Sequence, residues 1–131
     1  MNKDLELRLT PWQRMTEEHH EFFTWLCHNL GWFAMKPCKE GANILIYVEY
    51  IPDDGEDDTA YMLGDDEHQF EIYLDKRLPL GMLIDYLCHE MAHVRSWHHD
   101  EPDDHGPEFG RAYAAIYRKY LDLYDMWWGE Q

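Results

Sequence analysis

Residues 79–97, PLGMLIDYLCHEMAHVRSW, combine an apolar stripe and a histidine motif within one predicted helix. Apolar residues recur there every three or four positions, the spacing that gathers side chains on one side of a helix. The stripe consists of Leu80, Leu83, Ile84, Leu87, Met91 and Val94. His89 and His93 fall nearly opposite this stripe, among further apolar residues. We therefore expect a helix that begins at Pro79, ends near Trp97 and is buried on two sides.

The motif in this helix, His89-Glu90-Met91-Ala92-His93, has the form HExxH. Two imidazoles one helical turn apart can bind one tetrahedral Zn²⁺ with bonds of about 2.0–2.1 Å. Glu90 lies roughly 60° around the helix from His93, so its carboxylate is expected beside the metal rather than on it. Zinc lowers the pKa of water toward about 7, and a neighbouring carboxylate can accept the proton. The motif predicts a hydrolase with His89 and His93 as ligands and Glu90 as the general base.

A catalytic zinc usually has a third protein ligand besides water. The candidates downstream are His98, His99, His105 and Glu108. His99 has the spacing of HExxHxxGxxH, but Ser96 stands where that pattern has glycine for a tight turn. His105 precedes Gly106 and Pro107, which predict a turn that leads back into a helix. We favour His105 and keep the other three as alternatives.

The remaining chain predicts helices and strands in one domain. Residues 10–31 have helical periodicity, with a possible capping box at the beginning and glycine at the end. Residues 43–51 and 68–75 read as strands and candidate hairpin partners, and residues 31–36 as a shorter strand. A last helix begins at Pro107. This order predicts a single α+β domain over residues 1–131.

Composition limits the class of protein. With 131 residues and 45% hydrophobic content, the chain can bury a core. It contains no apolar run near the roughly 20 residues that a membrane helix needs, and no signal-peptide pattern. The three cysteines form no CxxC motif, which indicates reduced thiols. We expect a cytoplasmic protein without membrane contact.

The net charge is −16, from 11 basic and 27 acidic residues. Phosphate contacts need clustered lysine and arginine, so this charge disfavours direct nucleic-acid binding. It favours solubility, basic partners or mimicry of the charge of DNA.

HEMAH at residues 89–93, followed by HGPEF at residues 105–109, resembles the SprT-like, or Spartan, family of zinc metalloproteases. Residues 70–74, FEIYL, and residues 78–87 are also similar to the family's approach to its active helix. The resemblance covers roughly residues 70–120 and is loose before that range.

The resemblance implies a zincin-like fold with an N-terminal helix, a small β-sheet, the HExxH helix and a C-terminal helix. It also implies that His89, His93 and His105 bind the metal, that Glu90 is catalytic, and that Phe109 is a packing position. Two departures limit the resemblance. Many members carry a zinc ribbon or DNA-binding tail, which we do not expect here, and members with basic surfaces differ from this chain with its net charge of −16.

We therefore expect a zinc-dependent peptidase that acts on a protein or peptide substrate. An extended substrate segment is expected to bind against the strand at residues 70–74. Arg111 and Tyr113 are candidates to stabilise an oxyanion, although a solvated charge and a core aromatic are their ordinary roles. Residues 127–128, Trp-Trp, indicate either a pinned terminal helix or a docking patch.

Two other functions remain open. One is an acidic, zinc-stabilised binding or inhibitor protein without catalysis, for example a DNA mimic. The other is hydrolysis of a non-peptide amide or ester. The metal in the cell, whether zinc, manganese or iron, and the oligomeric state do not follow from the sequence.

Overall fold

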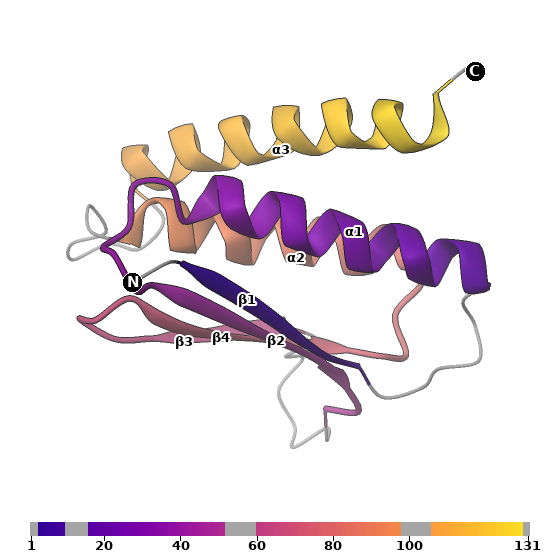
Figure 1. Ribbon diagram of the computed structural model, residues 1–131, viewed down its shortest axis with the longest axis horizontal. Helices are drawn as coiled ribbons and strands as arrows, with labels where there is room; N and C mark the ends of the chain where they lie inside the picture. Colours follow the sequence, from indigo (N-terminus) through magenta and orange to yellow (C-terminus); the bar gives the residue numbers. More distant parts are fainter. Residues whose placement is uncertain (1–2, 10–15, 52–59, 98–105, 130–131) are drawn as a thin grey trace.

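The computed structural model describes residues 3–9, 16–51, 60–97 and 106–129 of the chain. Within these ranges, four strands form one sheet in the spatial order β1-β2-β4-β3 (Figure 1). The strands are β1 (Asp4–Leu9), β2 (Asn43–Glu49), β3 (Ala60–Gly64) and β4 (Gln69–Asp75). β1, β2 and β4 run parallel, whereas β3 pairs antiparallel with β4. β1 and β3 are therefore the edge strands, and β4 lies inside the sheet.

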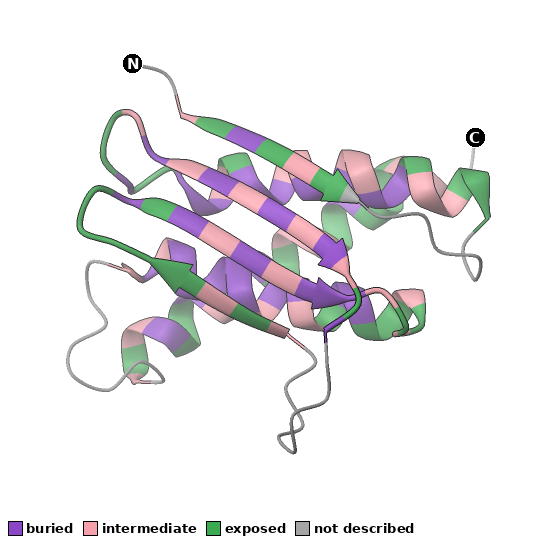
Figure 2. Cartoon of the chain, turned by 90° about the horizontal axis from the view of Figure 1, so that it is seen from below, coloured by how far each residue is buried: buried purple, intermediate pink, exposed green. Residues whose placement is uncertain are grey.

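The strands alternate between buried and more accessible residues, as Figure 2 shows. Ile44, Ile46 and Val48 of β2 are fully buried on one face, and Phe70, Ile72 and Leu74 of β4 are their register neighbours. This period of two follows from the pleat, which directs successive side chains to opposite faces. Only one face of the sheet therefore contributes to the core.

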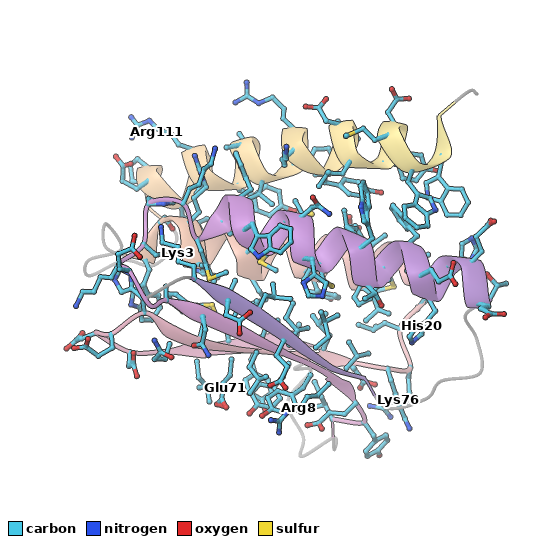
Figure 3. The ribbon with its side chains drawn as sticks, in the orientation of Figure 1. Lys3, Arg8, His20, Glu71, Lys76 and Arg111 are labelled. Atoms are coloured by element: carbon cyan, nitrogen blue, oxygen red, sulfur yellow. The ribbon has the colours of Figure 1, made fainter. Side chains whose placement is uncertain are left out.

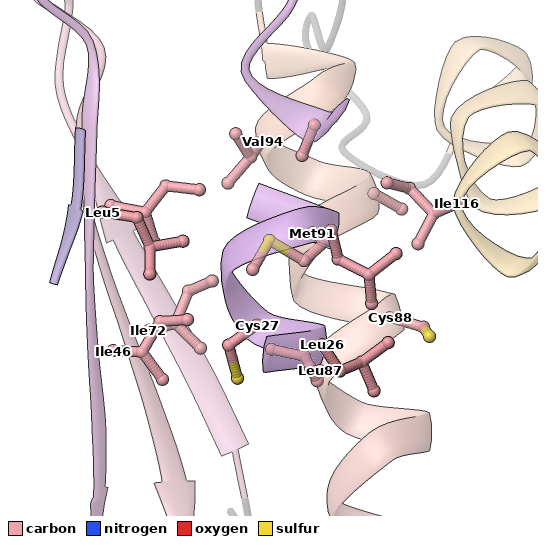
Figure 4. Packing of buried hydrophobic residues seen from close by; sticks show 14 of the residues in the cluster. Leu5, Leu26, Cys27, Ile46, Ile72, Leu87, Cys88, Met91, Val94 and Ile116 are labelled. Atoms are coloured by element: carbon pink, nitrogen blue, oxygen red, sulfur yellow. The ribbon is translucent and has the colours of Figure 1, made fainter. Parts of the chain in front are cut away.

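The helices α1 (Glu17–Ala34), α2 (Leu80–Arg95) and α3 (Pro107–Trp128) all lie on that buried side (Figure 1). α1 and α2 pack directly on the sheet, and α3 lies across their outer side. The core between the sheet and the helices is shown in Figure 4 and includes Leu26, Ile46, Ile72, Leu87, Met91 and Val94. The described residues thus form one small α+β domain, as expected. None of the described helices has the length and apolar character to cross a membrane.

The first helix differs from the prediction at both ends. It begins at Glu17, where the Thr16 hydroxyl accepts a hydrogen bond from the His19 backbone N–H at 3.1 Å. The predicted capping box at residues 10–13 lies outside the described residues. The helix does not stop at Gly31 but continues to Ala34, so the strand predicted at residues 31–36 was wrong. Gly31 is required by packing, because a Cβ there would overlap the side chain of Leu5.

Two strands escaped the prediction, and one pairing was wrong. The two predicted strands are confirmed as β2 and β4, but they are parallel neighbours and not a hairpin. The hairpin partner of β4 is β3, and β1 precedes the first helix. The chain therefore begins with a strand where a helix was expected to be the first element. Alternation over residues 4–9 was the available signal, since Leu5 is buried between exposed Asp4 and Glu6.

Candidate metal centre

The predicted metal motif lies within α2, in a helix that is covered on both sides. Leu83, Leu87 and Met91 are fully buried against the sheet and α1. Pro79 is the N-cap of α2, and Ser96 is its C-cap, with its backbone N–H bonded to the Ala92 carbonyl at 3.0 Å. The expected helix from Pro79 to about Trp97 is thus confirmed to within two residues at each end.

His89 and His93 lie side by side on the side of α2 that faces α3. Their Nε2 atoms are 3.3 Å apart, and their ring centroids are 4.9 Å apart. A tetrahedral ion with bonds of about 2.0–2.1 Å holds two ligand atoms roughly 3.3–3.4 Å apart. The spacing of the two nitrogens therefore fits two ligands of one tetrahedral metal ion.

Glu90 follows His89 and is also buried, with 6% of its surface exposed. Burial raises the pKa of the Glu90 carboxyl to about 7, because desolvation disfavours its charged form. None of the described residues forms an ion pair with Glu90 that would offset this cost. A carboxyl with a pKa near neutrality can both take up and release a proton at neutral pH.

The beginning of α3 covers the two histidines with aromatic rings. The Phe109 ring centroid is 4.4 Å from that of His93 and 5.1 Å from that of His89. The Tyr113 ring lies 6.1 Å from His89, one turn further along α3. Because Phe109 is only 8% exposed, it shields the imidazoles from bulk water on this side. Phe109 thus packs at the predicted position.

Of the two oxyanion candidates, the structure places only Tyr113 beside the histidines. The Arg111 side chain is 72% exposed and pairs with Glu108 at 2.5 Å, so it has the ordinary role of a solvated charge. Figure 3 shows Arg111 projecting outward from the beginning of α3. Burial raises the pKa of the Tyr113 hydroxyl, which keeps it protonated and able to donate a hydrogen bond.

Three candidates for a third metal ligand, His98, His99 and His105, lie outside the described residues. Among the residues that are described, no third histidine, cysteine, aspartate or glutamate joins the pair into a metal-binding group. Glu108 is described, and its carboxylate is engaged by Arg111.

The location expected for a substrate segment is wrong. Both backbone edges of β4, which includes residues 70–74, are already paired, with β2 on one side and β3 on the other. The neighbouring edge strand is β3, which the sequence analysis missed. Its only signal was a short apolar run, AYML at residues 60–63, too short to stand out after an acidic stretch of sequence.

β3 contacts the end of α2 through the turn that follows it. The indole N–H of Trp97, just beyond α2, donates a hydrogen bond to the Asp65 carbonyl at 3.1 Å, in the turn between β3 and β4. The Trp97 ring also packs against Phe70 with centroids 5.5 Å apart. The edge strand and the histidine helix are thus held as one unit.

The aromatic residues at the C-terminus pin the last helix. Trp127 lies 5.1 Å from Trp25, and Trp128 lies 5.3 Å from Phe22, measured between ring centroids. These ring contacts pack the end of α3 against α1.

Neither a family model, nor a curated protein, nor a solved structure significantly matches the chain. Its function must therefore be argued from the geometry of the site.

Proposed function

We propose that this chain is a zinc-dependent metallopeptidase with a zincin-like fold, similar to the SprT-like family. The observation that carries the proposal is the pair of Nε2 atoms 3.3 Å apart, with a buried glutamate between them in sequence. The spacing also suits a hydrogen bond between the two imidazoles, but burial of His93 beneath Phe109 sets the pair apart from exposed surface histidines. A purely structural zinc site would have four protein ligands and no use for Glu90.

His105 is the proposed third ligand. α3 begins at Pro107 with Gly106 as its N-cap, one turn before Phe109. Phe109, three residues after Gly106, contacts His93 and His89, so the beginning of α3 lies beside the two imidazoles. This supports a ligand from the residue just before Gly106, whereas the Glu108 carboxylate is engaged by Arg111.

Zinc, when bound, would polarise the scissile carbonyl and make a water molecule more acidic. The Glu90 carboxylate would accept a proton from the attacking water and deliver it to the leaving amine. Glu90 is buried and lies roughly 60° around α2 from His93, which is the basis for placing its carboxylate beside the ligand pair. Tyr113 would donate a hydrogen bond to the oxygen that gains negative charge.

An extended substrate segment would bind along β3. This edge strand has one backbone edge unpaired among the described strands, and strand addition is a common mode of peptide recognition. The Trp97 contacts support this placement, because they fix the β3–β4 turn relative to α2.

We also propose that the protein works in the cytoplasm. Its three cysteines, Cys27, Cys38 and Cys88, are all free thiols, which suits a reducing compartment.

Metal analysis and proteolysis together test the proposal. The wild-type protein should hold about one zinc per chain and degrade an unfolded protein such as reduced casein. Glu90→Gln should keep the metal and lose activity by about 10²-fold or more. Glu21→Gln, an equal change on the exposed side of α1, should keep both.

The third ligand is tested in the same assay. His105→Ala should lose the metal, whereas His99→Ala should retain it. The reverse result would move the site to the shorter spacing. Stoichiometric zinc without hydrolysis by either wild type or Glu90→Gln would favour the acidic binding or inhibitor protein, and absence of any transition metal would contradict both functions.

A further inference from the structure

The face of the sheet that points away from the helices carries a row of tyrosines. Tyr47 of β2, Tyr73 of β4 and Tyr61 of β3 are direct register partners. Their rings stack with centroids 4.7 Å apart for Tyr47 and Tyr73, and 4.6 Å apart for Tyr61 and Tyr73. Arg8 of β1 continues this tyrosine row, with its guanidinium 5.8 Å from the Tyr47 ring centroid. The row therefore crosses every strand of the described sheet.

The charges beside the tyrosine row are mostly negative. By the alternation of the strands, Glu6, Glu49 and Glu71 project from the same face as the row. Figure 3 shows Glu71 and Arg8 on the side of the sheet opposite the helices. Arg8 is the only basic residue of the described strands, and Glu6 pairs with it at 3.3 Å. The face thus combines aromatic rings with excess negative charge.

This face is unusual for strands that run parallel. Parallel strands are generally covered on both faces, whereas the described elements cover only one face of β1, β2 and β4. Tyr47 and Tyr73 are half-buried, and each stacks on a neighbouring ring of the row. An accessible aromatic row of this kind is typical of a contact surface.

We propose that this face docks an extended, arginine-rich segment of another protein. Guanidinium groups satisfy both features of the surface, because they pair with carboxylates and lie favourably on aromatic rings. The fold already contains contacts of this kind with tyrosine, Arg8 on Tyr47 and Arg77 on Tyr50, the latter at 4.3 Å. The negative charge disfavours nucleic acid, the other polymer that binds rows of aromatic residues.

The docking face is separate from the candidate metal centre, since the sheet lies between it and α2 (Figure 1). The proposal therefore does not depend on catalysis. It can be tested in the Glu90→Gln background, where a substrate would not be cleaved.

Fluorescence anisotropy with a labelled nona-arginine peptide tests the docking face. The triple variant Glu6→Gln, Glu49→Gln and Glu71→Gln should bind at least about ten-fold more weakly in about 150 mM salt. The control variant Glu21→Gln, Asp122→Asn and Asp125→Asn has the same net charge but alters the exposed helices, and its affinity should change less than about two-fold.

A second variant separates the rings from the charges. Tyr47→Leu preserves every carboxylate and should still weaken binding several-fold, with folding checked by circular dichroism. Equal losses in the two triple variants would overturn the proposal, because attraction would then come from net charge alone. Preference for a labelled oligothymidine over the peptide, or full binding by Tyr47→Leu, would also overturn it.

Discussion

The Phe109 ring lies against the imidazole of His93, with ring centroids 4.4 Å apart. This contact joins α3 to the candidate ligands of α2. The orientation of the imidazoles therefore depends on packing as well as on the helix that carries them. Groups that orient metal ligands from outside typically contribute about 10–100-fold to metal affinity, and the apolar shell of a site controls its access to solvent.

Phe109→Ala should weaken zinc binding by about 10–100-fold, because His93 and His89 lose the surface that orients them. It should also lower the free energy of unfolding by about 3–5 kcal/mol, the usual effect of removing a buried phenylalanine. Competition with a chromophoric chelator measures the first effect and urea unfolding the second. Tyr117→Ala, on an exposed part of the same helix, is the control. Unchanged zinc affinity in folded Phe109→Ala would show that the imidazoles are positioned by α2 alone.

Gly31→Ala should destabilise the protein although alanine favours helices. A Cβ at Gly31 overlaps Leu5 Cδ1, and overpacking of a core costs about 1–3 kcal/mol. The gain in helix propensity is about 1 kcal/mol, so the net loss should be about 1 kcal/mol.

Gly110→Ala is the matched control, because nothing lies within 4 Å of its added Cβ. It should raise the free energy of unfolding by up to about 1 kcal/mol. In the Leu5→Ala background, Gly31→Ala should cost less stability than in the wild type, because the overlapping side chain is gone. A double-mutant cycle of urea unfolding measures this difference. Equal stabilisation by both glycine substitutions would contradict the packing argument.

Asp75 should make the free energy of unfolding decrease at acid pH. Its carboxylate accepts hydrogen bonds from the Arg77 side chain and from the Arg77 backbone N–H at 2.9 Å, which hold the Asp75 pKa below 3.8. Asp75 therefore contributes stability above about pH 4, and this contribution is lost as pH falls through its lowered folded-state pKa.

Asp75→Asn should lower the free energy of unfolding by about 1–3 kcal/mol at pH 7, with a smaller difference from wild type at pH 2–3. Chemical unfolding across this pH range measures both values. Asp122→Asn on the exposed side of α3 should show almost no difference at either pH. A pH-independent effect of Asp75→Asn would assign the loss to packing and not to charge.

The cysteines should resist alkylation in the folded protein. Burial raises the pKa of Cys88 to about 12 and that of Cys38 to about 11, and it also raises the pKa of Cys27. Because the thiolate is the reactive form, iodoacetamide at pH 8 should label all three at least about 10²-fold more slowly than in guanidinium chloride. Mass spectrometry of each cysteine-containing peptide measures the rates. Rapid labelling of Cys88 in the native state would contradict the packing of α2 against α3.

The sequence alone determined the elements whose signals are local. The apolar stripe and the HExxH motif defined α2, proline after glycine located the beginning of α3, and alternation defined β2 and β4. These signals depend on residues a few positions apart, so they can be recognised without knowing which other segment each element packs against. The α+β class and the pairing of His89 with His93 follow from them.

Tertiary structure decided the features that depend on which surfaces meet. Gly31 lies inside α1 and leaves space for Leu5 of β1, although helices often end at a glycine. β2 and β4 are parallel because the chain runs back through β3 between them, and β3 pairs with the other edge of β4. Likewise, Phe109 lies on His93 only because α3 crosses α2 at its histidines. Contacts between distant segments depend on burial and on the fit of their surfaces. Periodicity along the chain identifies a buried face, but it does not indicate which segment packs against that face.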